Sequence, residues 1–165
     1  MSTSSPPAGY HSVNAYITVK GAAEALAFYK KAFNAQERYR LASPDGKIMH
    51  AEIAIGDSVI MLSDEAPDWG ALSPKTIGGC PFTLIVYVPD VDAAHAQAVQ
   101  AGATPTMPVS DQFWGDRMGG VLDPYGFKWS LATHIEDVSP EEIQKRFEAF
   151  AVNEGGCAES SDKSA

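Results

Sequence analysis

The sequence is poor in cysteine and in long apolar runs. Its 165 residues include two cysteines, Cys80 and Cys157, which lie far apart and form no CxxC pair. The chain therefore offers neither a disulfide framework nor a thiolate metal site, and we expect a protein of the reducing cytoplasm. No apolar run reaches the length of about 20 residues that a membrane-spanning helix needs.

Basic residues are also scarce. Lys and Arg together number 12 against 21 Asp and Glu, which gives a formal net charge of −9. Nucleic acids and anionic membranes are bound by basic faces, so the charge argues against both as partners. The N-terminal stretch MSTSSPPAGYH lacks the basic region and the apolar core of a signal peptide, and we interpret residues 1–11 as a disordered leader.

What the sequence does contain is an internal repeat. Residues 13–36 and 82–105 both alternate like a strand and then continue as an amphipathic helix, and Val19 aligns with Val88 at a shift of 69 residues. The same shift carries GKIM onto GDRM, so that about fifty residues align without a gap. We interpret the repeat as a duplicated unit of one strand, one helix and three further strands.

The repeat predicts the organisation of the whole chain. The expected segments are a disordered leader (1–11), a first unit (12–64), a turn-rich linker (65–80), a second unit (81–134), a C-terminal helix (135–151) and a disordered tail (152–165). The motif SPEE supplies a capping box for the C-terminal helix. Its apolar stripe of Ile143, Phe147 and Phe150 predicts packing on the domain or on a partner subunit.

Turn signals separate the strands of each unit. In the second unit, GDRMGGVLDPYGFKW (115–129) reads as a hairpin whose turn is DPYG. The expected strands are 13–19, 36–42, 47–55 and 58–63 in the first unit and 82–88, 104–109, 116–122 and 127–133 in the second.

Together with MHAEI, DQFWGDR, DPYGFKW and ATHIEDVSPEE, this pattern resembles the glyoxalase/bleomycin-resistance/dioxygenase family, also called the vicinal oxygen chelate superfamily, and its PhnB-like branch in particular. The resemblance covers residues 12–148. It implies an α+β fold in which tandem βαβββ repeats form a concave half-barrel sheet with helices on the convex side, here with a C-terminal helix added. It also implies a homodimer.

The resemblance further identifies four positions at which metal-dependent members hold a divalent cation. In this chain they are Asn14, Met61, Thr83 and Ser130. An amide, a thioether and two hydroxyls lack the basicity and charge of the imidazole and carboxylate ligands that such cations use. We therefore expect no metal and no other cofactor, and the family's glyoxalase and dioxygenase chemistry is disfavoured.

Strand alternation predicts which side chains line the concave face. From the first unit we expect Asn14, Tyr16, Thr18, His50, Glu52, Ala54 and Met61. From the second we expect Thr83, Ile85, Tyr87 and Ser130, and the shift of 69 adds Arg117, Gly119 and Val121. Phe113 and Trp114 would form an aromatic wall at the mouth of the cavity.

Several of these residues have structural alternatives. Phe113 and Trp114 are also typical of a core or a dimer interface, and Arg117 of an ion pair with Asp116. His50 and Glu52, two residues apart on one strand face, suit a base and its orienting acid, or an edge-strand pair without a catalytic role.

Another histidine, His134, is followed by Glu136 and Asp137. We expect it to form a local hydrogen-bonded corner after the last strand.

The expected function is that of a metal-free, homodimeric protein that binds and sequesters a small planar or aromatic molecule, similar to the drug-resistance members of the family. Its expected ligand-binding residues are Asn14, Tyr16, Met61, Thr83, Tyr87, Phe113, Trp114, Arg117 and Ser130. One alternative is a metal-dependent lyase, isomerase or dioxygenase-like enzyme that uses His50 and Glu52. Another is a subunit whose cavity is filled by its own side chains and that acts through protein contacts.

Overall fold

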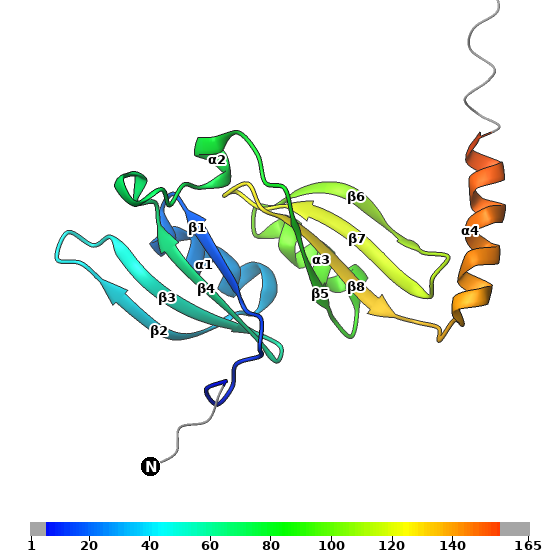
Figure 1. Cartoon of the computed structure of the whole chain (residues 1–165), viewed down its shortest axis with the longest axis horizontal. Helices are drawn as coiled ribbons and strands as arrows, with labels where there is room; N and C mark the ends of the chain where they lie inside the picture. Colours follow the sequence, from blue (N-terminus) through cyan, green and yellow to red (C-terminus); the bar gives the residue numbers. More distant parts are fainter. Residues whose placement is uncertain (1–5, 156–165) are drawn as a thin grey trace, which may run out of the picture.

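The computed structural model describes residues 6–155, which fold into two βαβββ units and a C-terminal helix (Figure 1). The predicted fold class is confirmed. The first unit consists of β1 (Ala15–Val19), α1 (Ala22–Phe33), β2 (Gln36–Ala42), β3 (Ile48–Ile55) and β4 (Ser58–Asp64). The second consists of β5 (Thr83–Tyr87), α3 (Val91–Gln100), β6 (Thr104–Asp111), β7 (Asp116–Leu122) and β8 (Lys128–His134). The linker holds two short helical turns, η1 (Pro67–Trp69) and α2 (Pro74–Ile77).

Each unit forms its own four-stranded sheet, with strand orders β1-β4-β3-β2 and β5-β8-β7-β6. The outer strands are joined by antiparallel hairpins, whereas β1 pairs with β4 and β5 with β8 in parallel. A parallel pair needs a long crossover connection, which the intervening helix and hairpin supply. Figure 1 shows the two sheets next to each other, with α1 and α3 on the same side of them.

The core lies between these helices and the sheets. Ile17 and Val19 on β1 and Ile53 on β3 are fully buried, together with Leu26 and Tyr29 of α1. This follows from the expected alternation, because one face of each strand packs against an apolar helix stripe while the other face points away. The helices α1 and α3 also pack against each other, so the two units share one core.

The DPYG turn contributes a buried carboxylate to that core. Asp123 is 3% exposed, and it accepts hydrogen bonds from the hydroxyl of Tyr29 and the indole N–H of Trp129, both at 2.9 Å. The backbone amides of Tyr125 and Phe127 donate to its other oxygen at 2.8 and 2.9 Å. Burial raises the pKa of Asp123. Four donors compensate this desolvation, so the predicted turn also links the two units.

The repeat has no constant shift. Met61 on β4 corresponds to Ser130 on β8 at 69 residues, but its neighbour Glu52 on β3 corresponds to Gly120 on β7 at 68 residues. The turn between β7 and β8 is one residue longer than the turn between β3 and β4. The gap-free alignment predicted from the sequence is therefore wrong for β7.

A slip of one residue moves every side chain of a strand to the opposite face. Arg117, Gly119 and Val121 consequently face the helices, and their predicted position on the concave face is wrong. Val121 is fully buried in the core. At Gly119, a Cβ atom would lie 2.7 Å from Val109 Cγ2 and 2.9 Å from the ring of His95 on α3, so this position has no room for a side chain.

The C-terminal helix α4 (Pro140–Gly155) begins where the capping box predicts, with the amide of Glu142 donating to Ser139 Oγ at 3.2 Å. It continues past the predicted end at residue 151. Figure 1 shows α4 standing beyond the second sheet, away from α1 and α3. The predicted disordered ends fall partly on residues 1–5 and 156–165, which lie outside the described residues. Within residues 6–155, no helix is long and apolar enough to cross a membrane.

Candidate functional site

The concave face is the side of the two sheets opposite α1 and α3, and its centre is aromatic. Tyr16 on β1 and Ile85 and Tyr87 on β5 alternate with buried core residues and are 51%, 58% and 62% exposed. Their predicted orientation is confirmed. A cleft of about 330 Å³ separates the start of β1 from β5 and is lined, among others, by Asn14 and Tyr87. Apolar walls with a few polar groups are typical of small-molecule sites.

The four positions of the family's metal site carry no suitable ligands. Asn14 is occupied by its own turn, because its amide nitrogen donates to the carbonyl of His11 at 2.6 Å and its oxygen accepts from the His11 amide at 3.2 Å. Met61, Thr83 and Ser130 add a thioether and two hydroxyls, which do not fit a divalent cation. In residues 6–155, no group of three or more His, Cys, Asp or Glu side chains is arranged to hold a metal ion.

In the first unit, His50 on β3 lies between Tyr16 and Glu52. The hydroxyl of Tyr16 is 3.2 Å from His50 Nδ1, and His50 Nε2 is 3.4 Å from Glu52 Oε1. Hydrogen bonds from the hydroxyl of Tyr10 and then from His50 lower the pKa of Glu52. An ionised Glu52 only accepts, so we assign the proton of neutral His50 to Nε2, and Nδ1 then accepts from Tyr16. We call Tyr10, Tyr16, His50 and Glu52 the His50 cluster.

Residues of the predicted leader contribute to this cluster. The guanidinium of Arg38 lies 5.0 Å from the ring centroid of Tyr10 and donates to the carbonyl of Gly9 at 3.4 Å. The segment before β1 therefore folds back onto the first sheet instead of remaining free of it. The sequence gave no signal for this, because Tyr10 and Arg38 meet through a long-range contact.

In the second unit, Asp116 on β7 is the centre of a polar cluster on the concave face. Asp116 is 4% exposed and accepts from Tyr87 Oη at 2.9 Å and from Trp114 Nε1 at 3.1 Å; its other oxygen lies 2.8 Å from His134 Nδ1. Burial opposes ionisation, but the hydrogen bonds from His134, Tyr87 and Trp114 outweigh it and lower the pKa of Asp116. We call these four residues the Asp116 cluster.

The predicted corner at His134 is confirmed. Its Nε2 atom lies 2.9 Å from Asp137 Oδ1, so the imidazole joins two carboxylates. Asp137, and then Asp116, raise the pKa of His134. The predicted ion pair between Asp116 and Arg117 is wrong, because adjacent residues of a strand point to opposite faces.

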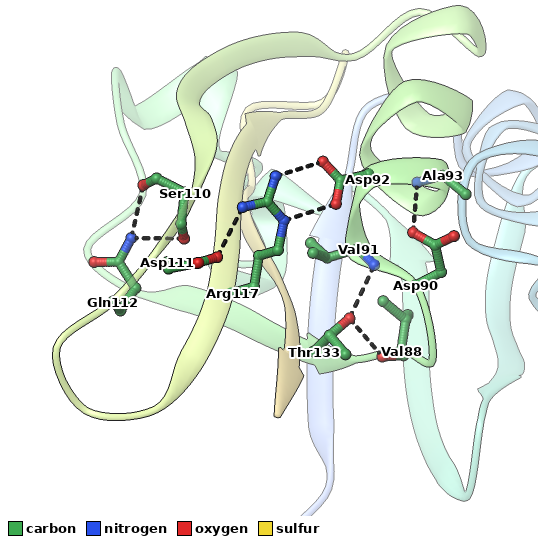
Figure 2. A network of polar contacts seen from close by, with 10 residues as sticks. All are labelled: Val88, Asp90, Val91, Asp92, Ala93, Ser110, Asp111, Gln112, Arg117 and Thr133. Atoms are coloured by element: carbon green, nitrogen blue, oxygen red, sulfur yellow. Dashed lines mark hydrogen bonds and ion pairs between the residues drawn. The ribbon is translucent and has the colours of Figure 1, made fainter. Parts of the chain in front are cut away.

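Arg117 instead joins α3 to the end of β6. Figure 2 shows its guanidinium between the carboxylates of Asp92 and Asp111. Nε and Nη2 donate to Asp92 at 2.7 and 2.8 Å, and Nη1 donates to Asp111 at 2.7 Å. This geometry satisfies the guanidinium on the side of the sheet that carries α3. The arrangement supports the structural alternative for Arg117.

Phe113 packs against the C-terminal helix. Its ring centroid lies 4.8 Å from Trp114 in an edge-to-face arrangement, and 5.7 and 5.9 Å from Phe147 and Phe150 of α4. Phe113 therefore covers part of the apolar stripe of α4, as its structural alternative predicts, while Trp114 belongs to the Asp116 cluster.

Known proteins share this architecture. A protein of Mycobacterium bovis is 42% identical to this chain over 132 residues, which are 78% of this chain and 87% of that protein. An X-ray structure of an Arabidopsis thaliana gene product is 27% identical, with a TM-score of 0.60 over 74% of this chain and 98% of that chain. FosX, a fosfomycin resistance protein of Listeria monocytogenes crystallised with Mn(II) and sulfate, has a TM-score of 0.57 at 17% identity, over 82% of this chain and 95% of that chain.

A family model extends over most of the two units. It matches residues 10–131 and is described as the Glyoxalase/Bleomycin resistance protein/Dioxygenase superfamily. Those residues include the first unit, the linker and all but the last residues of β8. With its tandem βαβββ topology, the chain belongs to the glyoxalase/bleomycin resistance protein/dioxygenase superfamily.

Proposed function

We propose that the protein binds a small planar or aromatic molecule on its concave face without a metal ion. The observation that carries the proposal is the exposure of Tyr16 and Tyr87, 51% and 62%, next to each other's sheets around the cleft of about 330 Å³. Both hydroxyls are held by polar partners, Tyr16 by His50 and Tyr87 by Asp116. Oriented aromatic rings supply stacking area at a small entropic cost.

Metal independence rests on the chemistry of the donors. FosX, which shares the fold, was crystallised with Mn(II). The corresponding positions of this chain, inferred from family resemblance, are the neutral set Asn14, Met61, Thr83 and Ser130. The same motifs support an assignment to the PhnB-like branch, and the two separate cysteines support a cytoplasmic location.

We further propose that a second copy of the chain covers part of the concave face. Half-exposed apolar side chains gathered on one face are typical of an interaction surface. Besides Ile85, Phe147 and Phe150 on α4 are 48% and 47% exposed. Sedimentation equilibrium of the full chain at micromolar concentration should give the mass of a dimer, and a monomeric mass would contradict this part of the proposal.

Binding is tested with the planar fluorophore 8-anilinonaphthalene-1-sulfonate. We expect Tyr16→Ala and Tyr87→Ala to weaken its binding about tenfold each, since this corresponds to the 1.4 kcal/mol within reach of one aromatic contact. Trp69→Ala is the matched control, because Trp69 is 82% exposed in the linker. Equal affinities in all three variants would rule out the concave face as the binding surface.

A second candidate is an enzyme that uses His50 and Glu52. It is favoured by the distance of 3.4 Å between His50 Nε2 and Glu52 Oε1, which suits a base and its orienting carboxylate. If these residues also recruit a metal, elemental mass spectrometry after incubation with Zn²⁺, Ni²⁺ or Fe²⁺ should give about one ion per chain, and His50→Ala should lose it. Equal metal content in both proteins would remove the metal-dependent form of this candidate.

A further inference from the structure

The Asp116 cluster joins four separate parts of the second unit. Tyr87 ends β5, Trp114 lies in the turn before β7, Asp116 begins β7 and His134 ends β8. The side chains of the other three reach one carboxylate that is 4% exposed. A buried carboxylate is stable only while such donors remain in place.

His134 extends this cluster to the segment that precedes α4. Its Nδ1 faces Asp116 at 2.8 Å and its Nε2 faces Asp137 at 2.9 Å. A carboxylate only accepts, so both contacts are hydrogen bonds only when both ring nitrogens carry a proton. Neutral imidazole has one N–H, and its other nitrogen would present a lone pair to a carboxylate.

The same segment is attached to the hairpin through Gly115. The carbonyl of Gly115 accepts hydrogen bonds from the amides of Ile135 at 2.9 Å and Glu136 at 3.0 Å. Gly115 has a φ of 100°, and a Cβ atom there would overlap the Glu136 carbonyl oxygen. The close approach of the two backbones therefore depends on glycine and lies directly beside Asp116.

Little else fixes the position of α4. Arg146 of α4 pairs with Glu136 through both of its terminal nitrogens at 2.8 Å, and Phe147 and Phe150 contact Phe113. Figure 1 shows the helix apart from the rest of the fold. Helices gain most of their stability from tertiary packing, so the connection at residues 135–139 decides where α4 lies.

We infer that Asp116 and His134 form a proton-operated latch that holds the connection to α4 against Gly115 and opens when His134 loses its proton. The latch goes beyond the proposed function, since it needs no ligand. Its opening frees residues 135–139 and α4, while Asp116 keeps its bonds to Tyr87 and Trp114.

The charged groups around His134 determine the direction of the pH dependence. Asp116 on β7 and Asp137 in the connection face the imidazole, whereas Glu136 is paired with Arg146 of α4. Both facing groups are anionic and raise the pKa of His134. The stabilisation is complete below the ordinary histidine pKa of about 6.5 and is lost as the pH rises through the higher pKa of the folded state. The latch is therefore closed at neutral and mildly acidic pH and opens at alkaline pH.

The test is an NMR titration of the full chain between pH 5 and pH 9.5. Two quantities are measured: the titration of the His134 ring, and the protection of the Ile135 and Glu136 amides against exchange, normalised to their intrinsic rates. We expect His134 to titrate above its ordinary range and the protection to fall over the same pH interval. The fall should be about tenfold for each unit by which the pKa is raised.

Three variants separate the latch from general pH effects. His134→Gln should give low protection of both amides at every pH, because Gln cannot donate to both carboxylates. Asp137→Asn, at a fully exposed position, should move the His134 titration and the loss of protection together to lower pH. His11→Gln is the matched control and should behave like the wild type.

Two outcomes would overturn the latch. One is a His134 ring that titrates at its ordinary pKa in the wild type. The other is amide protection of Ile135 and Glu136 that does not change across the titration of His134. Asp137→Asn keeps the inference open to refutation if His134→Gln does not fold, because it changes only a surface side chain.

Discussion

The hydroxyl of Tyr29, on α1 of the first unit, donates a hydrogen bond of 2.9 Å to Asp123 in the turn between β7 and β8 of the second unit. The two residues are 0% and 3% exposed. Their contact lies inside an aromatic group in which the Tyr29 ring is 5.5 Å from Trp129 and 6.0 Å from Tyr125. One buried carboxylate therefore couples the folding of the two units.

We predict that Tyr29→Phe lowers the free energy of unfolding by about 1.5–3 kcal/mol, the range for a buried hydrogen bond to a charged group. The ring stays in place, so the loss comes from the hydroxyl. Urea denaturation followed by circular dichroism measures the change. Tyr125→Phe is the control, because its hydroxyl makes no hydrogen bond within residues 6–155 and its removal should cost less than about 0.5 kcal/mol. Equal losses in both variants would contradict a specific role for the Tyr29–Asp123 contact.

The fold was predictable because the repeat and the alternation are local properties of the sequence. Tyr16 and Tyr87 occupy the concave face for the reason that alternation gives. The error for Arg117 arose where this local signal was replaced by similarity of letters: GKIM and GDRM align at a shift of 69, but the strands align at 68. A turn that is one residue longer cannot be recognised from the letters of the strands, and its effect is to exchange the two faces.

The polar clusters were only partly predictable. His50 and Glu52 are two residues apart on one strand, so their contact follows from the strand geometry. Asp116, by contrast, takes its partners Tyr87 and His134 from two other strands, and only the tertiary structure brings them together. Tyr10 reaches Glu52 in the same way, from a segment whose composition resembles a disordered leader.

The close approach at Gly115 leads to a second prediction. Gly115→Ala should destabilise the protein by more than about 2 kcal/mol, since it combines a positive φ of 100° with overlap against the Glu136 carbonyl and with a Cβ contact of 2.9 Å to Val138. Thermal unfolding and urea denaturation both report the loss.

The matched control is Gly46→Ala. Gly46 has a φ of 88°, but a Cβ atom there meets nothing within 4 Å among the described residues. It should therefore cost only the conformational part, about 1 kcal/mol. If both variants lost the same stability, the steric contact with the connection to α4 would have no energetic role.

Glu65 gives a prediction about acid stability. Its carboxylate accepts from the backbone amide of Ser73 at 2.7 Å. Hydrogen bonds from the Ser73 and Thr76 hydroxyls and from that amide lower the pKa of Glu65 to about 2. A depressed pKa stabilises the fold above the ordinary glutamate pKa and ceases to do so as the pH falls through the folded value.

We therefore expect Glu65→Gln to be less stable than the wild type at pH 6, and the difference between them to shrink between pH 5 and pH 2. The measurement is the urea midpoint of both proteins at each pH. Asp57→Asn, on an exposed turn, serves as the control and should show no such convergence. A stability difference that stays constant down to pH 2 would mean that the charge of Glu65 is unimportant.

The position of Arg117 separates the corrected geometry from the one that the repeat predicted. Arg117 pairs with Asp92 and Asp111, whose side chains are 58% and 66% exposed. Exposed ion pairs are worth about 0–1 kcal/mol each, so Arg117→Ala should lower the free energy of unfolding only modestly. Because its side chain lies on the helix side of β7, it should leave binding of 8-anilinonaphthalene-1-sulfonate unchanged.

Tyr87→Ala is the comparison, since Tyr87 is 62% exposed on the opposite face. Fluorescence titrations of the two variants should therefore differ, with a weaker affinity for Tyr87→Ala and the wild-type affinity for Arg117→Ala. The contrary result, weaker probe binding by Arg117→Ala at unchanged stability, would mean that Arg117 reaches the ligand. In that case its contacts with α3 and β6 would have to give way when the ligand binds.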